Sequence, residues 1–325
     1  MQALVVKKYG KADGLAIMEG PEPKAGKGEV LVKVRAVGLN PVDGYILSGN
    51  YALRPEPPFI PCFDGSGVVM SVGPGVGKWR SGDEVFFLLP SPGAAAGVVS
   101  VPEHALAALP AGLSTVAGAA LGIPYVTAAA ALFGRGKRQD GEQILVHGAT
   151  GAVGHAALEW LRYRNRREGI RNRIMASAGS QEGLEKLIKM PDVSVLDHRE
   201  TNHLEKALEI SGRKGVDLAL EMNAHIYLGK ILPVLAPHGR VVIIGSQGTT
   251  LMNPRDLMVR QAAVLGFSLF QVREQMRKKI LDEIASTPAG TWDPPIAETF
   301  PLSQAGNAFS SLLQGPRRGK IVLEF

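Results

Sequence analysis

The sequence is poor in cysteine and in long apolar runs, and both shortages exclude classes of protein. Cys62 is the single cysteine in 325 residues, which excludes an internal disulfide and a zinc site built from several thiolates. No uncharged apolar run reaches the ~18 residues of a membrane span. Residues 1–7 are typical of a strand and not of a charged-then-apolar leader. We therefore expect a soluble, cytoplasmic protein with no membrane contact.

Acidic residues are also in short supply. Lys and Arg number 36 against 30 Asp and Glu, which gives a net charge of +6. Much of the excess lies in residues 162–173, which hold six arginines and one glutamate. A solvated helix end and loop would explain them, because cations are favourable near a helix C-terminus. An anionic partner such as RNA, or the additional phosphate of a cofactor, are the alternatives.

The pattern of apolar residues changes near residue 115 and indicates two kinds of domain. The first third has strand-like runs separated by glycine and proline, typical of a small barrel or curled sheet: 1–7, 29–37, 67–72 and 84–89. Beyond it, candidate strands alternate with helical stretches. The strand candidates are 143–146, 174–178, 193–196, 216–221, 240–245 and 263–267, and the helical stretches are 155–163, 182–190, 202–211, 227–235 and 254–260. This alternation predicts a doubly wound parallel sheet. The last strand, 320–325, is expected to return to the first domain.

A glycine-rich turn after the first of these alternating strands is the strongest chemical signal. Gly148, Gly151 and Gly154 follow the apolar residues 143–147. Glycines at this spacing let the backbone approach a diphosphate, and the helix N-terminus beyond them supplies unpaired N–H groups and a favourable dipole. Such glycines can also mark a mere turn. Between a strand and a helix they favour dinucleotide binding.

The end of the second alternating strand bears on which dinucleotide binds. Folds specific for NAD usually place a carboxylate there to hold the ribose 2′-OH. This strand ends in Ala178-Gly179-Ser180, which leaves room for a 2′-phosphate with Ser180 as a donor. Glu182 follows in the first turn of a helix, where a glutamate is favourable for capping alone. The sequence therefore predicts NADPH rather than NADH.

Motifs spread over nearly the whole chain carry a family resemblance. They include Gly38-Leu39-Asn40-Pro41-Val42-Asp43, Ser48-Gly49-Asn50-Tyr51, Gly122-Ile123-Pro124-Tyr125, Val146-His147-Gly148-Ala149-Thr150-Gly151, Asp197-His198-Arg199-Glu200, Gly245-Ser246-Gln247-Gly248 and Asn253-Pro254-Arg255-Asp256. With these motifs the chain resembles the zeta-crystallin-like NADPH:quinone oxidoreductases of the zinc-independent medium-chain dehydrogenase/reductase superfamily. The resemblance implies a GroES-like β-rich catalytic domain, residues 1–118 and 267–325, and a Rossmann dinucleotide-binding domain, residues 119–266. It also implies a homo-oligomer, either a dimer or a tetramer.

The resemblance further implies where ligands bind. The quinone side of the active site would be lined by Asn40, Tyr45 and Tyr51. The resemblance and the inferences above from the glycine turn and Ser180 together give one set of expected cofactor-binding residues. They are Tyr45, Gly148, Thr150, Gly151, Ala152, Val153, Gly154, Gly179, Ser180, His198, Tyr227, Ile244, Gly245, Ser246, Gln247, Phe267, Ser268 and Leu269. No residue is expected to bind metal. From the residues alone, the two tyrosines could equally pack a loop, and His198 could be a surface residue that caps one.

Two segments and two single residues depart from the family pattern. The segment 93–99 is Gly-Ala-Ala-Ala-Gly-Val-Val, where polar and aromatic residues are common in the family. Tyr227 stands where an asparagine that contacts the cofactor is expected, with Asn223 or His225 as possible substitutes. The arginine-rich stretch is expected to lengthen the connection between the first helix and the second strand. Cys62 replaces a usual glycine, and as a lone cysteine it is expected to be a small buried residue.

The predicted reaction needs little acid–base machinery. Hydride chemistry belongs to the nicotinamide, and a reduced quinone takes protons from water. The seven histidines are scattered, with no spacing typical of a metal site or a catalytic triad. We therefore predict an NADPH-dependent quinone reductase. There are two alternatives. The protein could reduce an activated C=C bond in an enal or enone, or it could be a weakly catalytic NADPH-binding protein that binds RNA through residues 162–173.

Overall fold

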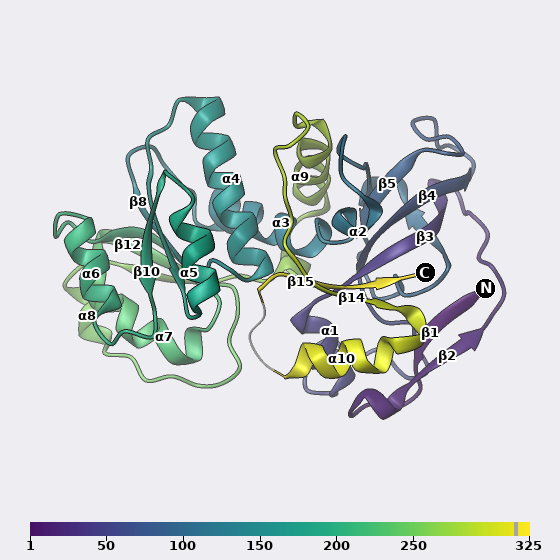
Figure 1. Ribbon diagram of the computed structural model, residues 1–325, viewed down its shortest axis with the longest axis horizontal. Helices are drawn as coiled ribbons and strands as arrows, with labels where there is room; N and C mark the ends of the chain where they lie inside the picture. Colours follow the sequence, from purple (N-terminus) through teal and green to yellow (C-terminus); the bar gives the residue numbers. More distant parts are fainter. Residues whose placement is uncertain (315–317) are drawn as a thin grey trace. The chain divides into compact units, whose positions relative to one another are not determined.

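The computed structural model describes residues 1–314 and 318–325. It divides the chain into two compact units (Figure 1): unit 1 comprises Met1–Val126 and Arg273–Phe325, and unit 2 comprises Thr127–Val272. Both divisions fall somewhat later in the chain than the expected domain ends at 118 and 266. The first is later because helix α3 (Gly122–Ala129) begins inside unit 1, where the N–H of Ile123 donates to Asp64 at 2.7 Å.

Unit 1 is β-rich, as predicted. Its main sheet has the strand order β14-β15-β3-β4-β5-β7, and β6 also pairs with β3. The strands are β3 (Glu29–Leu39), β4 (Asp64–Val72), β5 (Glu84–Leu88), β6 (Val98–Pro102), β7 (Leu106–Ala108), β14 (Ile296–Pro301) and β15 (Lys320–Glu324), beside a separate hairpin of β1 (Gln2–Val6) and β2 (Leu15–Glu19). Its helices are α1 (Pro41–Leu47), α2 (Thr115–Gly118), α9 (Glu274–Ser286) and α10 (Ala305–Leu313). The antiparallel pairing of β15 with β3 confirms that the last strand returns to this domain.

Unit 2 contains the predicted parallel sheet. Its six strands lie in the order β10-β9-β8-β11-β12-β13. They are β8 (Gln143–His147), β9 (Arg173–Ala178), β10 (Val193–Asp197), β11 (Val216–Glu221), β12 (Leu235–Ile243) and β13 (Ala263–Gly266). The order reverses between β8 and β11, so the carboxyl ends of these two strands form the switch point where open α/β sheets bind ligands. Figure 1 shows helices along this sheet, which are α4 (Ala152–Glu168), α5 (Gln181–Ile188), α6 (His203–Ile210), α7 (Ala224–Ile231) and α8 (Pro254–Met258).

Each unit has its own apolar core. Residues from β1, β3, β5 and α10 form the core of unit 1, and one face of the unit 2 sheet packs against α6 and α7. Consecutive β8 residues Ile144, Leu145 and Val146 are all buried, as expected for a parallel strand covered on both faces. In the part of the chain that the structure describes, no helix is long and apolar enough to cross a membrane.

Helix α4 is longer than predicted, and this corrects the expectation of a lengthened connection. The helix was expected over 155–163, but it runs from Ala152 to Glu168 and takes in the first part of the arginine-rich stretch. Arginine is a good helix former because its unbranched side chain loses little freedom in a helix. Gly169, with φ of +66°, ends the helix in the left-handed conformation.

Candidate functional site

The glycine turn joins β8 to α4 in the manner of a diphosphate cradle. Gly148 has φ of +77°, a left-handed conformation that favours glycine. Gly151 is the N-cap of α4. The N–H groups of Ala152, Val153 and Gly154 follow in the first turn, where a helix offers them no internal acceptor. These groups and the helix dipole suit an anion.

Gly154 is required by packing. A Cβ at this position would lie 2.4 Å from the carbonyl oxygen of Gly148 and 2.7 Å from the Cα of Ala149. Both neighbours are backbone atoms, so neither can move aside without reshaping the turn. The start of α4 therefore lies against the turn, and only glycine permits this approach.

The carboxyl end of β9 lies beside this turn. Ser177 Oγ accepts a hydrogen bond from the N–H of Gly148 at 3.0 Å and lies 3.1 Å from Nδ1 of His198. A Cβ on Gly179 would lie 2.1 Å from Nε2 of His198. Ser180 caps α5, where its Oγ accepts from the N–H of Gly183 at 3.2 Å. The expected residues Gly148, Gly179, Ser180 and His198 are thus close together.

No carboxylate stands at the end of β9, which fits a ligand with a 2′-phosphate. The nearest acid along the chain, Glu182, lies in the first turn of α5 and forms an ion pair with Lys186 at 3.3 Å. This agrees with the helix role expected for Glu182. The site residues therefore fit NADPH, both in the diphosphate cradle and at the adenosine end.

The loops after β12 and β13 contribute to the same edge of the sheet. Ile244 donates its N–H to the Glu221 carbonyl at 2.9 Å, and Phe267 donates to the Ile243 carbonyl at 3.0 Å. A Cβ on Gly245 would lie 2.4 Å from the Met222 carbonyl oxygen. The remaining expected residues here differ in exposure: Ser246, Gln247 and Ser268 are exposed and Leu269 is buried.

Sequence reasoning missed a cluster of histidines at this edge, and the expectation that all seven are scattered was wrong. His147, His198 and His203 come together with Tyr227, and ring centroids lie 4.2 Å apart for His147 and Tyr227 and 5.4 Å apart for His147 and His198. Glu221 Oε2 is 3.0 Å from His147 Nδ1. The signal was the position of His147 and Glu221, each the last residue of a strand at the switch point.

The cluster changes the interpretation of His198. Burial, followed by the neighbouring His147 and His203, lowers the pKa of His198 to about 4. The ring is therefore neutral at neutral pH and is half-buried among other rings. His198 is not a surface residue that only caps a loop.

Tyr227 packs within this cluster. Its ring meets His147 at an interplanar angle of 69°, and Lys230 Nζ lies 5.5 Å from its centroid. Burial, then Glu221, raises the pKa of its hydroxyl. Of the two expected substitutes for asparagine, His225 accepts the Gln247 N–H through Nδ1 at 3.2 Å, and Asn223 donates its backbone N–H to Glu221 Oε1 at 2.5 Å.

The expected quinone-side residues all lie in unit 1. Tyr45, on α1, and Tyr51 are half-buried, and their rings are stacked with centroids 6.4 Å apart. Burial, followed by Tyr45, raises the pKa of the Tyr51 hydroxyl. Asn40 is the N-cap of α1 and only 2% exposed. The structure therefore brings the two tyrosines together and buries Asn40.

Asn40 belongs to a buried polar network. Its Nδ2 donates to Asp64 Oδ1 at 2.8 Å, and Lys320 Nζ donates to Asn40 Oδ1 and, at 3.0 Å, to Asp64 Oδ2. The backbone N–H of Asn40 donates to Asp43 Oδ2 at 2.7 Å. Burial raises the pKa of Asp43 to about 7, and Oδ1 of this carboxyl accepts no hydrogen bond from the described residues.

Cys62 and the segment 93–99 are structural. Cys62 is buried, and burial, followed by Asp43 and Asp64, raises the pKa of its thiol. This agrees with the expectation of a small buried residue. The Cys62 carbonyl accepts the N–H groups of Gly93 and Ala94, and Leu4 donates to the Ala95 carbonyl at 2.9 Å. The alanines of this segment are buried, so their small size serves packing.

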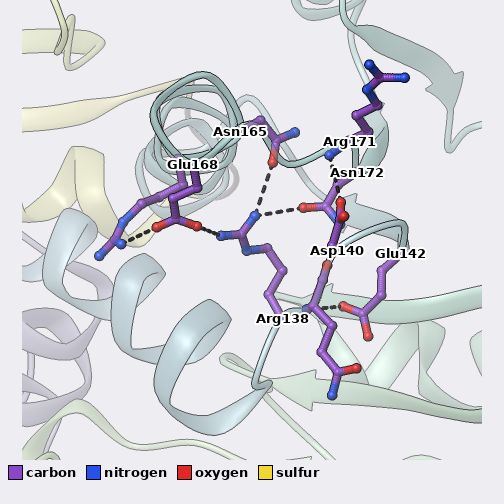
Figure 2. Close-up of polar contacts among 9 residues, drawn as sticks. Arg138, Asp140, Glu142, Asn165, Glu168, Arg171 and Asn172 are labelled. Carbon is purple, nitrogen blue, oxygen red and sulfur yellow. Dashed lines mark hydrogen bonds and ion pairs between the residues drawn. The ribbon is translucent and has the colours of Figure 1, made fainter.

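Much of the arginine-rich stretch is engaged within unit 2. Figure 2 shows Arg138, which donates to Asn165 at 3.1 Å, to Asn172 at 2.8 Å and to Glu168 at 2.6 Å. Burial alone would raise the pKa of Glu168, but hydrogen bonds from Arg164 and Arg138 outweigh it and lower that pKa. The exposed arginines of the stretch are Arg166, Arg167, Arg171 and Arg173.

A metal centre has no support from the side-chain geometry. Among residues 1–314 and 318–325, no group of three or more His, Cys, Asp or Glu side chains is arranged to hold a metal ion. The histidine cluster is no exception, because its imidazoles contact each other, Glu221 and backbone or hydroxyl groups rather than converging on one point.

Known proteins resemble the chain over its full length. Residues 26–111 match the alcohol dehydrogenase GroES-like domain, and residues 193–323 match the zinc-binding dehydrogenase family. The quinone oxidoreductase of Homo sapiens is 35% identical over 99% of this chain and 97% of that protein. The quinone oxidoreductase of Thermus thermophilus, solved alone and with NADPH, is 32% identical with a TM-score of 0.82 and 100% of both chains covered. The CurK enoyl reductase is 25% identical with a TM-score of 0.87, covering 99% of this chain and 98% of that one.

Proposed function

The chain belongs to the quinone oxidoreductase family of the medium-chain dehydrogenase/reductase superfamily, and on that premise we propose that it reduces small quinones with NADPH and without metal. The observation that carries the proposal is the cradle of Gly148, Gly151 and Gly154 at the sheet's switch point, with no carboxylate at the end of β9. Likeness to quinone oxidoreductases over the full length of the chain supports the choice of acceptor.

Each part of the cradle has a binding role in this proposal. Bound NADPH supplies the hydride. The N–H groups of Ala152, Val153 and Gly154 hold its diphosphate, because they lack helical acceptors and carry the positive end of the dipole. Gly179 and Ser180 leave room for the 2′-phosphate. The loops at 244–247 and 267–269, together with Thr150, Gly151 and His198, complete the cofactor contacts.

Unit 1 supplies the quinone-side residues. We propose that Tyr45 and Tyr51 donate hydrogen bonds to a quinone oxygen and so stabilise the negative charge that develops there. Asn40 is assigned with them because it caps α1, the helix that carries Tyr45. The reduced quinone takes its proton from water, and no dedicated general acid is required. A single cysteine supports a reaction without zinc.

Optical assay of NADPH consumption tests the activity. Purified protein is given NADPH and a panel of small quinones and enones, with Tyr45→Phe/Tyr51→Phe as the test variant and Tyr163→Phe, far along the chain on α4, as its matched control. We expect quinone turnover by the wild type and by the control, and a loss of about tenfold or more in the double variant. Unaltered turnover in the double variant would remove the two tyrosines from the proposal.

Reduction of an activated C=C bond is the second candidate. The likeness to an enoyl reductase favours it, and it uses the same hydride and cofactor site. The same panel decides between the two, because an enone reductase turns over enones with higher kcat/KM than quinones.

RNA binding is a weaker proposal, since Arg162 and Arg164 form ion pairs with Asp192 and Glu168. RNA affinity that is unchanged when Arg166, Arg171 and Arg173 are replaced would remove it.

We also propose a cytoplasmic homo-oligomer. Strand β13 pairs with β12 and with no other strand of the described residues, and an edge strand can pair with another chain. Leu251, Met258 and Val259, from the same unit, are exposed by 96%, 73% and 67%. Light scattering after size exclusion tests the oligomer. Conversion to a monomer by Met258→Glu/Val259→Lys would support an interface there.

A further inference from the structure

A buried serine on β9, Ser177, joins the glycine turn to the residue that follows the neighbouring strand. Its exposed fraction is 0%, and its Oγ accepts the N–H of Gly148 at 3.0 Å. The same oxygen lies 3.1 Å from Nδ1 of His198, which directly follows β10. One hydroxyl therefore contacts both the turn after β8 and the ring after β10. The cofactor contacts proposed above do not include this serine.

The His198 ring is neutral at neutral pH and so has one N–H. Burial, followed by His147 and His203, lowers its pKa to about 4. The charged groups next to it, Asp197 and Arg199, form an ion pair with each other at 2.6 Å, and their effects on the ring oppose each other. A neutral imidazole has one nitrogen that donates and one that accepts. The nitrogen that holds the proton therefore decides what the ring offers to a ligand.

The Ser177 hydroxyl favours one of the two nitrogens. A serine hydroxyl has one hydrogen and two lone pairs, and the Gly148 N–H occupies one lone pair. If Ser177 donates to Nδ1 of His198, both contacts are satisfied and the proton of the ring is on Nε2. If Nδ1 donates instead, the Ser177 hydrogen has no acceptor among the described residues. A buried donor without a partner is costly, so hydrogen bonding favours the proton on Nε2.

Nε2 of His198 lies over Gly179, the first residue after β9. A Cβ on Gly179 would lie 2.1 Å from this nitrogen, so glycine leaves the room that the ring occupies. Among the described residues, Nε2 makes no hydrogen bond. Dinucleotide-binding folds hold the ribose 2′ substituent at the end of the second strand of the sheet, which here is β9. The N–H on Nε2 is thus a donor at the place where that substituent is recognised.

A donor at this place distinguishes the two nicotinamide dinucleotides. The 2′-phosphate of NADPH presents charged acceptor oxygens, whereas the 2′-OH of NADH both donates and accepts. A hydrogen bond to a charged acceptor is about twice as strong as one between neutral groups. An N–H on Nε2 therefore favours NADPH. A bare Nε2 would direct a lone pair at the phosphate and would suit only the hydroxyl.

We propose that Ser177 is a positioning residue for nucleotide choice: it holds the His198 ring with its proton on Nε2, and this N–H donates to the 2′-phosphate of NADPH. The ligand in this inference rests on the proposed function. The two contacts of Ser177 have separable consequences. Its bond to Gly148 shapes the diphosphate turn, which NADPH and NADH share, whereas its contact with His198 concerns the 2′ substituent alone.

Nitrogen-15 NMR of the histidine rings tests the position of the proton on the full-length protein, at neutral pH and without nucleotide. His198→Phe identifies the His198 signals by their loss. In the wild type we expect a protonated Nε2 and a bare, hydrogen-bonded Nδ1. Ser194→Ala, the matched control at a half-buried serine of β10, should keep this pattern, whereas Ser177→Ala should share the proton between the two nitrogens. A proton on Nδ1 of the wild-type ring overturns the inference.

Calorimetric titration with NADPH and with NADH tests the consequence for binding. His198→Phe keeps an aromatic ring but removes the donor, so we expect NADPH affinity to fall about tenfold and NADH affinity to change less. Ser177→Ala should lower the ratio of the two affinities in the same direction by a smaller factor, and Ser194→Ala should keep the ratio. If Ser177→Ala keeps the wild-type ratio, even while it weakens both nucleotides equally, the positioning role is overturned.

The double variant Ser177→Ala/His198→Phe separates positioning from a purely structural role. A residue that acts through the ring adds nothing once the donor is gone, so the affinity ratio should equal that of His198→Phe. A further drop in the ratio contradicts action through His198. If Ser177→Ala does not fold, an unchanged ratio in His198→Phe alone overturns the donor role. If the wild type binds neither nucleotide while its Nε2 is protonated, the proposed function fails, and with it the choice of nucleotide, but the control of the ring by Ser177 stands.

Discussion

Unit 2 leaves the N–H groups of its glycine motif without helical acceptors, whereas unit 1 buries Asn40, Asp64 and Lys320 in a network that satisfies them. The glycine turn and Asn40 both lie in motifs that carry the family resemblance. The contrast shows that motif residues can be left open to a ligand in one unit and held by buried side-chain partners in the other. Burial and hydrogen bonding separate the two, and neither is visible in a motif. The following predictions test this contrast.

The largest effect is expected from breaking the network of unit 1. Lys320→Met leaves the buried Asp64 carboxylate without its cation, 3.0 Å away, so we expect a loss of about 3–5 kcal/mol in the free energy of unfolding. Lys78→Met is the control, because its ion pair with Asp282 is exposed and exposed pairs contribute ~1 kcal/mol or less. Urea unfolding measures both. Equal stability of the two variants would contradict a structural role for the network.

The second effect is a pH dependence of the free energy of unfolding, which arises from Asp43 in unit 1. The folded-state pKa of Asp43 is raised to about 7, so its protonated carboxyl stabilises the fold at acid pH, and this contribution is lost as the pH rises toward 7. Between about pH 4 and pH 7, the wild type should lose on the order of 2–4 kcal/mol more of its free energy of unfolding than Asp43→Asn. Parallel curves for the two proteins would show that Asp43 is ionised in the fold.

A smaller effect on stability is expected in unit 2, together with a loss of NADPH binding that the control variant does not share. Gly154→Ala places a Cβ against the Gly148 carbonyl, so we expect a cost of about 1–3 kcal/mol and loss of most NADPH affinity. Gly306→Ala is the control, because its Cβ would meet no atom within 4 Å. Calorimetry should show unchanged NADPH binding in the control. Normal binding by Gly154→Ala would place the cofactor elsewhere.

The smallest effect is expected at Cys62. Its thiol is buried and its pKa is raised, so a thiol reagent should leave the folded protein and its NADPH consumption unchanged. The same reagent should label one thiol per chain after unfolding in guanidinium. Rapid labelling of the folded protein would instead indicate a reactive thiol.

The parallel sheet could be predicted because its signals are local. Apolar runs such as Val216–Glu221 are bounded by glycine and polar residues, and the structure has this strand at the same residues. The end of α4 was placed too early because arginine-rich sequence was interpreted as loop, although Gly169 marks the stop. Strand β14 was missed, since it alternates exposed and half-buried residues and gives no continuous apolar run.

The site could be predicted only in part, for a physical reason. The cradle depends on residues within seven positions of each other in the sequence, so its spacing is visible. His147, His203 and Glu221 are joined by pairing of β8 with β11 and by the start of α6, which no local pattern records. For Asn40, the motif was visible, but its bond to Lys320 spans the chain. The assignment of Tyr45, Tyr51 and the cofactor contacts stays a prediction.

Calorimetric titration of the wild-type protein with NADPH and, separately, with NADH tests the central claim most directly. The cradle at Gly148 with a carboxylate-free β9 end predicts one NADPH bound per chain, with an affinity at least about tenfold above that for NADH. Folded protein that takes up neither nucleotide at millimolar concentration, or that prefers NADH, would contradict the account.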